Sequence, residues 1–389
     1  MIQSILDNDL YKFTMQQAVH MLYPRVDVAY IFINRSDTPF PDGFAEKLQC
    51  EVNHMANFKL TSEEKAFLSD TCYFMTPVYL DFLEHYTFDP KEVCLHQDGG
   101  RLNLTIKGPW YRTILWEVPL MAIISELYFV MTNAEPLSHA KQTAINLNKA
   151  RVLSDNGIRF ADFGTRRRFS SLAHNTLIKD ILGVEGNTLI GTSNVFLAQH
   201  FNIKPIGTLA HEWFMFHAVL NGYRMANPTG VDAWIAAFHG DLGVALTDTF
   251  TTDVFLSTFD TMHAKLFDGV RHDSGDPFEY IEKVISHYKK LHINPITKTI
   301  VFSDGLDITK AVHIHEKCKG RINDSYGIGT NLTNDVGVTP LNIVIKLAKC
   351  RTAPDKAWHK AIKLSDDIAK NTGDREELDH CINVLQRGI

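Results

Sequence analysis

The chain lacks an excess of basic residues. Its 389 residues include 39 Lys and Arg against 45 Asp and Glu, so the formal net charge is −6. A general nucleic-acid-binding protein carries a basic excess that attracts phosphates. The composition excludes that class of partner, and we expect any anionic ligand to be held by a local cluster of cations.

Cysteine patterns and long hydrophobic runs are also missing. The six cysteines are scattered and none forms a CxxC pair, so neither a zinc ribbon nor a disulfide framework is predicted. The first residues lack the basic and apolar regions of a signal peptide. The most apolar stretch, Val118 to Met131, is interrupted by Pro119, Ser125 and Glu126 and is too short to cross a bilayer. We expect a reduced, cytoplasmic protein with no membrane partner.

The chain does contain ample material for a core, with 45% hydrophobic and 22% charged residues. Its length is compatible with one large or two medium domains. Near the N-terminus, Leu10 to Met21 has the apolar spacing of a helix, and Arg101 to Ile106 alternates as a half-buried strand does. Lys107 to Trp110 is expected to form a turn. This part is predicted to be a mixed α/β domain.

From about residue 150 the pattern changes to short apolar runs that end in polar or glycine-bearing tips and lead into helical patterns. Such alternation predicts parallel strands with crossover helices. Seven or eight units favour a closed βα barrel, and an open doubly wound sheet is the alternative. The units begin at Ile158, Asn187, Lys204, Gly243, Asp268, Lys298 and Asp324.

Residues that can carry chemistry fall just after these predicted strands. In a βα barrel the carboxyl ends of the strands meet at one mouth, where the active site lies. Seven separate loops would then supply one site. The residues concerned are Arg166, Ser193, His211, Asp248, Asp273, Asp304 and Gly327.

Two of these segments are suited to anions. In GIGTNLT, Gly327 and Gly329 let the backbone approach a phosphate, which N–H groups and Thr330 can bind, and a glycine-rich turn is the alternative. FGTRRRF places three arginines after a strand, and guanidinium groups suit phosphate and carboxylate oxygens. Such a run is usually a solvated helix face, but Arg166, nearest the mouth, is predicted to face an anion.

Carboxylates follow two of the later strands. In RHDSGDP, Asp273 could hold ribose hydroxyls or Mg²⁺, since carboxylates suit hard cations, whereas Asp276 has the alternative role of capping the next helix. In SDGLD, Asp304 at the strand tip could bind a sugar diol, and Asp307 is expected to cap the following helix. No protein side chain is assigned as a metal ligand.

One of the 18 histidines is distinguished by its position. His211, in AHEWF, follows a predicted strand, and Glu212 beside it could orient the imidazole or raise its basicity. An imidazole at the mouth is a candidate nucleophile toward a phosphoryl group. The segment lacks the second histidine of HExxH, so a zinc-protease site is rejected.

Eight segments follow the order found in one family: DNDLYKFTMQQAV, FGTRRR, GTSN, GTLAHEW, TDTFTTD, RHDSGDP, FSDGLD and GIGTNLTND. Together they resemble the nicotinate phosphoribosyltransferases across nearly the whole chain, and KLSDDIAKNTGD is similar to the family's C-terminal segment. The resemblance implies an N-terminal α/β domain of residues 1–130, completed by about 350–389. It also implies an irregular TIM-like βα barrel of residues 131–349, and a homodimer whose active sites lie between subunits.

The resemblance further implies a reaction. Nicotinate and phosphoribosyl pyrophosphate would give nicotinate mononucleotide and pyrophosphate in NAD biosynthesis, coupled to hydrolysis of ATP with Mg²⁺. His211 would be the residue that ATP phosphorylates. Displacing pyrophosphate from an anomeric carbon builds positive charge on the sugar, so the enzyme must position the base and bind the diphosphate.

The matched motifs imply roles for the other residues. Phe163 would stack on the pyridine ring, with Tyr11 of the partner subunit on the other face, and Asp304 would face the ribose. Gly327, Gly329 and Thr330 would hold the 5-phosphate. The nicotinate and the transferred sugar would be bordered by Arg166, Arg271 and Asp273.

Ser193 bears on the choice of substrate. Nicotinamide-using relatives place an aspartate in the segment corresponding to GTSN, where this chain has Ser193. Aspartate accepts hydrogen bonds from an amide but repels a carboxylate, so serine favours nicotinate. The alternatives are a transferase for nicotinamide or quinolinate, and a non-catalytic nucleotide-binding barrel. DDIAK at Asp366 to Lys370 departs from the family's proline-glycine loop, which leaves the role of Lys370 open.

Overall fold

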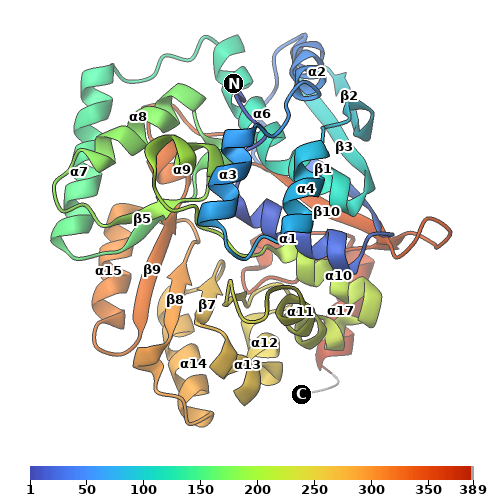
Figure 1. Ribbon diagram of the computed structural model, residues 1–389, viewed down its shortest axis with the longest axis vertical. Helices are drawn as coiled ribbons and strands as arrows, with labels where there is room; N and C mark the ends of the chain where they lie inside the picture. The colour runs from blue at the N-terminus through green and yellow to red at the C-terminus, as the bar shows by residue number, and fades with distance from the viewer. Residues whose placement is uncertain (387–389) are drawn as a thin grey trace.

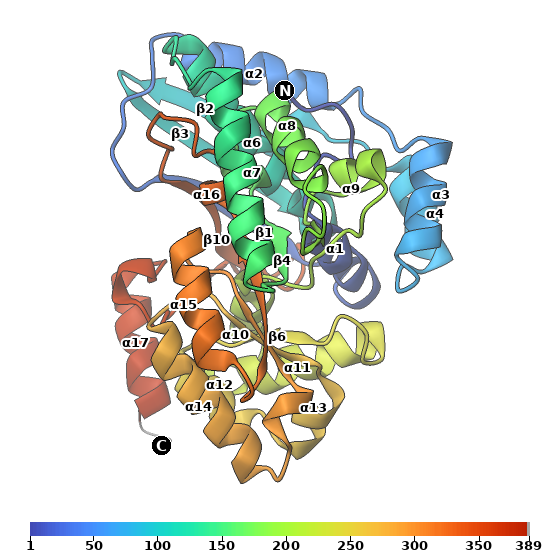
Figure 2. The ribbon, with the colours of Figure 1, turned by 90° about the vertical axis from the view of Figure 1, so that its left-hand side faces the viewer.

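The computed structural model describes residues 1–386 and contains two β-sheets, one antiparallel with five strands and one parallel with six. In Figure 2 the antiparallel sheet and its blue and teal helices form the upper part, and the yellow and orange helices around the parallel strands form the lower part. The predicted α/β class with parallel strands is confirmed. Figure 1 shows the teal strands of the antiparallel sheet above the orange strands of the parallel sheet.

The antiparallel sheet is built around β1 (Asp27–Asn34), which pairs with β3 (Arg101–Pro109) on one side and β10 (Ile343–Arg351) on the other. Its order is β11-β10-β1-β3-β2, with β2 at Val93–Asp98 and β11 at His359–Lys360. The alternating burial predicted for the start of β3 is confirmed, but the strand continues through Pro109, where a turn was predicted.

Helix α1 (Leu10–Leu22) confirms the first predicted helix and is buried on every side from Leu10 to Val19. It lies between the two sheets, which explains why its apolar residues are not confined to one stripe. The remaining helices of this part are α2 (Phe44–Met55), α3 (Ser62–Thr71), α4 (Pro77–His85), α5 (Trp110–Thr113) and α6 (Glu117–Met131), with the 3₁₀ turns η1 (Pro90–Glu92) and η2 (Ile114–Trp116).

The helical stretch Trp110–Met131, which spans α5 to α6, is long and apolar enough to cross a membrane, and 78% of its apolar window is buried inside the protein. It is longer than the sequence suggested because α5 and η2 lead directly into α6, and Pro119 lies in the first turn of α6, where its missing N–H costs no helical hydrogen bond. Such burial is typical of a core helix, so the stretch is weak evidence for a membrane span.

The parallel sheet has the order β5-β4-β9-β8-β7-β6. Its first strand in the chain, β4, therefore pairs with its last, β9, as the strands of a barrel do. Within residues 1–386, however, no ladder joins β5 to β6, so the predicted closed barrel is not confirmed. The strands are β4 (Phe160–Asp162), β5 (Leu189–Thr192), β6 (Val244–Leu246), β7 (Gly269–His272), β8 (Thr299–Phe302) and β9 (Asn323–Ile328).

The gap lies at the segment from Lys204, where a strand was predicted. That segment forms only one isolated bridge, between Thr192 and Pro205, and the prediction of a strand there is wrong. Helix α1 packs against it instead: the hydroxyl of Thr14 donates to the backbone oxygen of Thr208 at 2.5 Å. Proline also lacks the N–H that a ladder needs.

Helices connect the parallel strands and surround them. The predicted caps are confirmed, because Asp276 accepts hydrogen bonds from the first N–H groups of α14 and Asp307 does the same for α15. The helices are α7 (His139–Asp155), α8 (Ser171–Leu182), α9 (Val195–Phe201), α10 (His211–Asn221), α11 (Tyr223–Phe238), α12 (Thr252–Thr258), α13 (Thr261–Leu266), α14 (Pro277–Lys290), α15 (Ile308–Cys318) and α16 (Thr330–Thr333), with the 3₁₀ turns η3 (Thr165–Arg167) and η4 (Pro295–Thr297).

The C-terminal residues serve both parts of the molecule. Strands β10 and β11 join the antiparallel sheet. From Ala361 onward the chain leaves that sheet: Leu364 forms a bridge with Phe250, next to β6. After η5 (Ile368–Lys370), helix α17 (Arg375–Gln386) lies beside α11, where Tyr223 contacts Glu377 through its hydroxyl.

Candidate active site

A cavity at the carboxyl ends of the parallel strands contains five of the predicted site residues: Tyr11, Phe163, Arg166, Ser193 and Arg271. We call it the aromatic cavity, and its other lining residues include Asp9, Thr208 and Val301. The guanidinium of Arg166 lies 6.0 Å from the centre of the Tyr11 ring, and that of Arg271 lies 5.9 Å from the centre of the Phe163 ring. Flat aromatic walls and guanidinium groups suit a flat, anionic ring.

Tyr11 reaches this cavity from the same chain that supplies Phe163. The expectation that Tyr11 comes from a partner subunit is therefore wrong for this structure. The cause is the position of α1, because the backbone N–H of Leu10 donates to the oxygen of Ser193 at 2.8 Å and brings the next residue to the cavity. One chain thus supplies both aromatic walls.

Two glycines of the predicted phosphate segment pack against Phe163. A Cβ atom on Gly327 would lie 2.3 Å from the Phe163 ring, and one on Gly329 would lie 3.1 Å from the Phe163 backbone oxygen. Because these two glycines have no side chain, the Phe163 ring can pack directly against the backbone of their segment. Gly327, Gly329 and Thr330 do not line the aromatic cavity, and their role in holding a phosphate stays a prediction.

Asp9 is a cavity residue that the sequence reasoning missed. Its Oδ1 accepts a hydrogen bond from Ser193 Oγ at 2.7 Å, and its side chain is buried. Burial raises the pKa of Asp9, against the opposing effect of Arg166. Asp9 precedes α1 and has the appearance of a helix cap, but its side chain caps nothing. The one available signal was its place in the matched segment DNDLYKF.

A second cavity, which we call the cationic cavity, adjoins the first and shares Arg166 with it. It brings together His211, Asp273 and Asp304, three of the predicted residues. Its wall carries six cationic side chains. They form the local positive cluster that we expected an anionic ligand to need in a chain of net negative charge. They are Arg35, Arg166, Arg167, Lys346, Lys363 and Lys370.

Four of these cations, Arg35, Lys346, Lys363 and Lys370, do not follow any of the strands predicted for the barrel. The sequence did not single out the first three of them. Arg35 follows β1 and Lys346 lies within β10, so both belong to the antiparallel sheet. Burial lowers the pKa of Lys346 to about 8 and, with Arg166 nearby, that of Arg167 to about 10. An anion bound here would raise the pKa of both cations.

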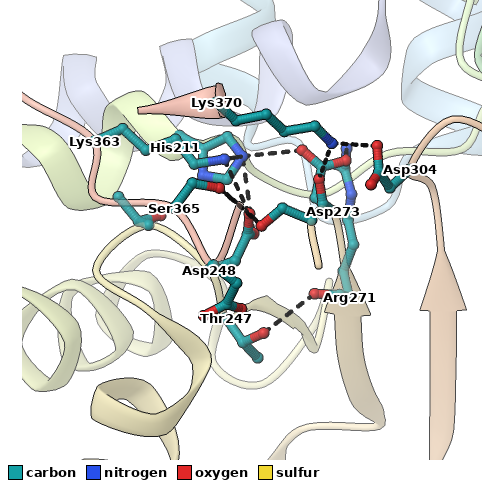
Figure 3. Close-up of polar contacts among 12 residues, drawn as sticks. His211, Thr247, Asp248, Arg271, Asp273, Asp304, Lys363, Ser365 and Lys370 are labelled. Atoms are coloured by element: carbon teal, nitrogen blue, oxygen red, sulfur yellow. Dashed lines mark hydrogen bonds and ion pairs between the residues drawn. The ribbon is translucent and has the colours of Figure 1, made fainter. Parts of the chain in front are cut away.

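His211 begins α10 and both of its ring nitrogens have partners (Figure 3). Nδ1 lies 3.0 Å from Thr249 Oγ1, and Nε2 lies 3.0 Å from both Asp273 Oδ2 and Lys363 Nζ. Burial, followed by the nearby Lys363 ammonium, lowers the pKa of His211 to about 4. The imidazole is therefore neutral at neutral pH and keeps the lone pair that a nucleophile needs.

Asp273 follows β7 and is fixed by two donors. Nη2 of Arg271 and Oγ of Ser303 reach its Oδ1 at 3.0 and 2.7 Å. Burial alone would raise the pKa of Asp273, but Arg271 and His211 hold it well below its usual range. Its other oxygen faces His211, so Asp273 is an ionised group beside the candidate nucleophile.

Asp304 lies after β8, and its Oδ1 forms an ion pair with Lys370. The same ammonium donates to the backbone oxygen of Asp273 at 2.9 Å. Lys370 therefore joins two predicted site residues, and the DDIAK loop is part of the site (Figure 3).

Glu212 does not orient the imidazole, and that expectation is wrong. Its carboxylate accepts from the buried ammonium of Lys12 at 2.9 Å, and Lys12 also pairs with Glu117 at 2.6 Å. Successive residues of a helix point in different directions, so neighbours in sequence do not meet. Glu117 in turn lies 3.4 Å from Arg166, so this buried ion cluster supports the wall of both cavities.

His211, Asp248 and Asp273 place potential metal-binding atoms within 4.8 Å of one another. The Lys363 ammonium lies among them, 2.9 Å from Asp248 Oδ2, and already supplies a positive charge. Mg²⁺ prefers a set of oxygen ligands, which an imidazole nitrogen does not complete. The cluster does not fit a resident Mg²⁺.

Two family models match the chain. The nicotinate phosphoribosyltransferase (NAPRTase) family model matches residues 158–389, and the model of the NAPRTase N-terminal domain matches residues 6–125. The chain belongs to the nicotinate phosphoribosyltransferase family. The resemblance drawn from its ordered motifs is confirmed.

Individual members of the nicotinate phosphoribosyltransferase family match over their full length. The nicotinate phosphoribosyltransferase of Desulforapulum autotrophicum is 77% identical over 389 residues, which cover 100% of both chains. The solved structure of that of Porphyromonas gingivalis has a TM-score of 0.97 at 44% identity and covers 99% of this chain and 100% of its own. That of Vibrio cholerae has a TM-score of 0.90 at 35% identity, with coverage of 100% and 96%.

Proposed function

We propose that this chain transfers a phosphoribosyl group from phosphoribosyl pyrophosphate to nicotinate, forming nicotinate mononucleotide and pyrophosphate for NAD biosynthesis. One observation carries the proposal: a cavity with two aromatic walls and two arginines adjoins a cavity with six cations, and Arg166 belongs to both. The first suits a flat anionic ring and the second suits a diphosphate. A reaction that joins these two ligands would take place where the cavities meet.

The residues around that junction fit the chemistry. Phe163 and Tyr11 would hold the pyridine ring between them, while Arg166 and Arg271 would bind its carboxylate. Asp304 would exchange Lys370 for the ribose hydroxyls, and the freed ammonium would face the diphosphate. The cations would neutralise the leaving pyrophosphate as positive charge develops on the sugar, which Asp273 would stabilise.

ATP is the proposed second substrate, and His211 its phosphoryl acceptor. The imidazole is neutral, it lines the cationic cavity, and Asp273 and Lys363 hold it in place. Mg²⁺ would arrive with the phosphates of ATP or of the diphosphate, because the carboxylates around His211 do not form a site for it on their own.

The assembly and the location of the protein are also proposals. The composition led us to expect a cytoplasmic protein, and the family resemblance led us to expect a homodimer with shared active sites. The aromatic cavity takes Tyr11 and Phe163 from one chain, which favours a site that one subunit completes even if the protein forms dimers.

An assay of pyrophosphate release tests the activity directly. Purified protein, phosphoribosyl pyrophosphate and Mg²⁺ are incubated with nicotinate or nicotinamide, each with and without ATP. We expect release with nicotinate and faster release when ATP is present. A preference for nicotinamide would overturn the assignment of the acid, and no release under any condition would favour a non-catalytic nucleotide-binding protein.

A further inference from the structure

The segment of residues 361–373, which we call the C-terminal strap, runs along the mouth of the parallel sheet. Leu364 donates its backbone N–H to the oxygen of Thr249 at 2.9 Å, and Thr251 donates its own to the oxygen of Leu364 at 3.0 Å. Lys363 also pairs with Thr372 across the strap. These backbone bonds fix Lys363 and Thr249 as neighbours on adjacent segments.

Lys363 and Thr249 contact His211 at its two different nitrogens. The Lys363 ammonium, whose side chain is 4% exposed, lies 3.0 Å from Nε2 and 2.9 Å from Asp248 Oδ2. The Thr249 hydroxyl lies 3.0 Å from Nδ1. The backbone pairing of these two segments therefore places both partners of the imidazole.

The chemistry of these partners decides where the imidazole proton lies. An ammonium group only donates, so its contact with Nε2 is favourable when Nε2 carries a lone pair. The proton of the neutral ring then lies on Nδ1, and the Thr249 hydroxyl accepts it. Asp273 favours the other tautomer, in which the proton lies on Nε2. Its Oδ2 lies 3.0 Å from Nε2 and would accept a hydrogen bond from that N–H.

Two observations favour Lys363 in this competition. Asp273 already accepts hydrogen bonds from Arg271 and Ser303 at its other oxygen, so its charge is partly compensated without the imidazole. Lys363 is buried, and its neighbours are Asp248 and His211. A buried ammonium that lost the Nε2 contact would lose one of two acceptors, which is costly.

We propose that Lys363 is a positioning residue: by donating to Nε2 of His211 at the wall of the cationic cavity, it keeps that nitrogen free of a proton. The consequence for catalysis rests on the proposed role of His211 as phosphoryl acceptor. The tautomer itself does not depend on that role. The C-terminal strap, which lies outside the strand–loop–helix units predicted from the sequence, would thus set the protonation of His211, the proposed nucleophile.

The tautomer can be read from long-range ¹H–¹⁵N spectra of full-length protein labelled at histidine, with His211 identified by the signals lost in His211→Gln. In the wild type we expect a lone-pair nitrogen at Nε2 and a protonated nitrogen at Nδ1. Lys363→Met should move the proton to Nε2, where Asp273 accepts it. Lys363→Arg keeps a donor and should preserve the wild-type pattern.

Lys360→Met is the matched control, because Lys360 lies just before the C-terminal strap but is exposed and pairs with Asp374 at 3.0 Å. It should leave the tautomer unchanged. A wild-type proton on Nε2 overturns the proposal even if Lys363→Met fails to fold. An unchanged tautomer in folded Lys363→Met overturns it as well.

A kinetic readout separates this proposal from the proposed function. Lys363→Met should slow phosphate transfer from ATP to His211 by roughly tenfold or more, as loss of an orienting partner does at other sites, with the KM for nicotinate nearly unchanged. Phosphate transfer at the wild-type rate in Lys363→Met would contradict the positioning role. If the wild type shows no phosphate transfer but has the expected tautomer, the phosphohistidine is rejected and the role of Lys363 in setting the imidazole stands.

Discussion

Ser193 donates a hydrogen bond from its hydroxyl to Oδ1 of Asp9 at 2.7 Å inside the aromatic cavity. The two residues lie 184 positions apart in the sequence, since Ser193 follows β5 and Asp9 precedes α1. Burial raises the pKa of Asp9, which favours its neutral acid beside a ligand carboxylate. We therefore propose that the choice between acid and amide rests on this pair of residues, whereas the sequence pointed to Ser193 alone.

Replacing Ser193 by aspartate should reverse that choice. Ser193→Asp places a second carboxyl group against Asp9, and a charge near the nicotinate carboxylate costs roughly 3 kcal/mol at close range, or about 100-fold in kcat/KM. The ratio of kcat/KM values for nicotinate and nicotinamide measures the effect. Ser193→Ala removes the hydroxyl without adding charge and should change the ratio far less. An equal ratio in Ser193→Asp and the wild type would show that this position does not select the substrate.

His211 should be the residue that ATP labels. Radioactive phosphate transferred from ATP should be stable in base and labile in acid, and His211→Gln should abolish it while nicotinate binding persists. His217 provides the control, because it lies in the same helix and is also buried, and burial lowers its pKa to about 4 as well. Its ring contacts Tyr23 and the Trp213 backbone, not the cavity, so His217→Gln should still be labelled.

Much of this arrangement could be predicted because it is local in the sequence. The tips after the parallel strands and the helix caps Asp276 and Asp307 depend on a few neighbouring residues, and the structure has them as predicted. The strand expected at Lys204 is reduced to one bridge with Thr192, and the backbone oxygen of Thr208, closer to α10, accepts a hydrogen bond from Thr14 of α1 and not from a strand. Contacts with distant parts of the chain outweigh the strand propensity of this segment.

The parts of the site that were missed come from distant elements. Asp9, Arg35, Lys346 and Lys363 have no motif around them that points to the cavity, and only the fold brings them together. Two of them reach the site because β1 and β10 pair across more than 300 residues of chain. From the sequence alone, a basic residue in an alternating strand is assigned to the face of the sheet that contacts solvent.

Mixing two inactive variants tests whether one chain completes the site. Tyr11→Ala removes one aromatic wall and Phe163→Ala the other, and each should reduce kcat/KM for nicotinate because the ring loses its stacking partner. If the walls belong to one chain, the mixture of the two variants should be no more active than either alone. Recovery of about a quarter of the wild-type activity after the subunits exchange would instead support a site shared between subunits.

The pair Asp7–Arg168 should be a major source of stability, because it ties the N-terminal segment to the loop after β4. Two parallel hydrogen bonds of 2.7 and 2.8 Å join the buried carboxylate and guanidinium, and Asn194 donates a third to Asp7. Asp7→Asn leaves the guanidinium uncompensated, which should lower the free energy of unfolding by roughly 3–5 kcal/mol at pH 7. Urea unfolding of both proteins measures the difference.

The same measurement repeated at several pH values checks the charge. Burial alone would raise the pKa of Asp7, but Arg168 lowers it below the ordinary value of 3.8. The stabilising contribution is therefore complete above the ordinary pKa and is lost as the pH falls toward the depressed one. The wild type should lose its advantage over Asp7→Asn only below about pH 4. Asp81→Asn, which removes an exposed partner of Lys65, should have a much smaller effect at every pH, and an equal effect of the two substitutions would refute the assignment.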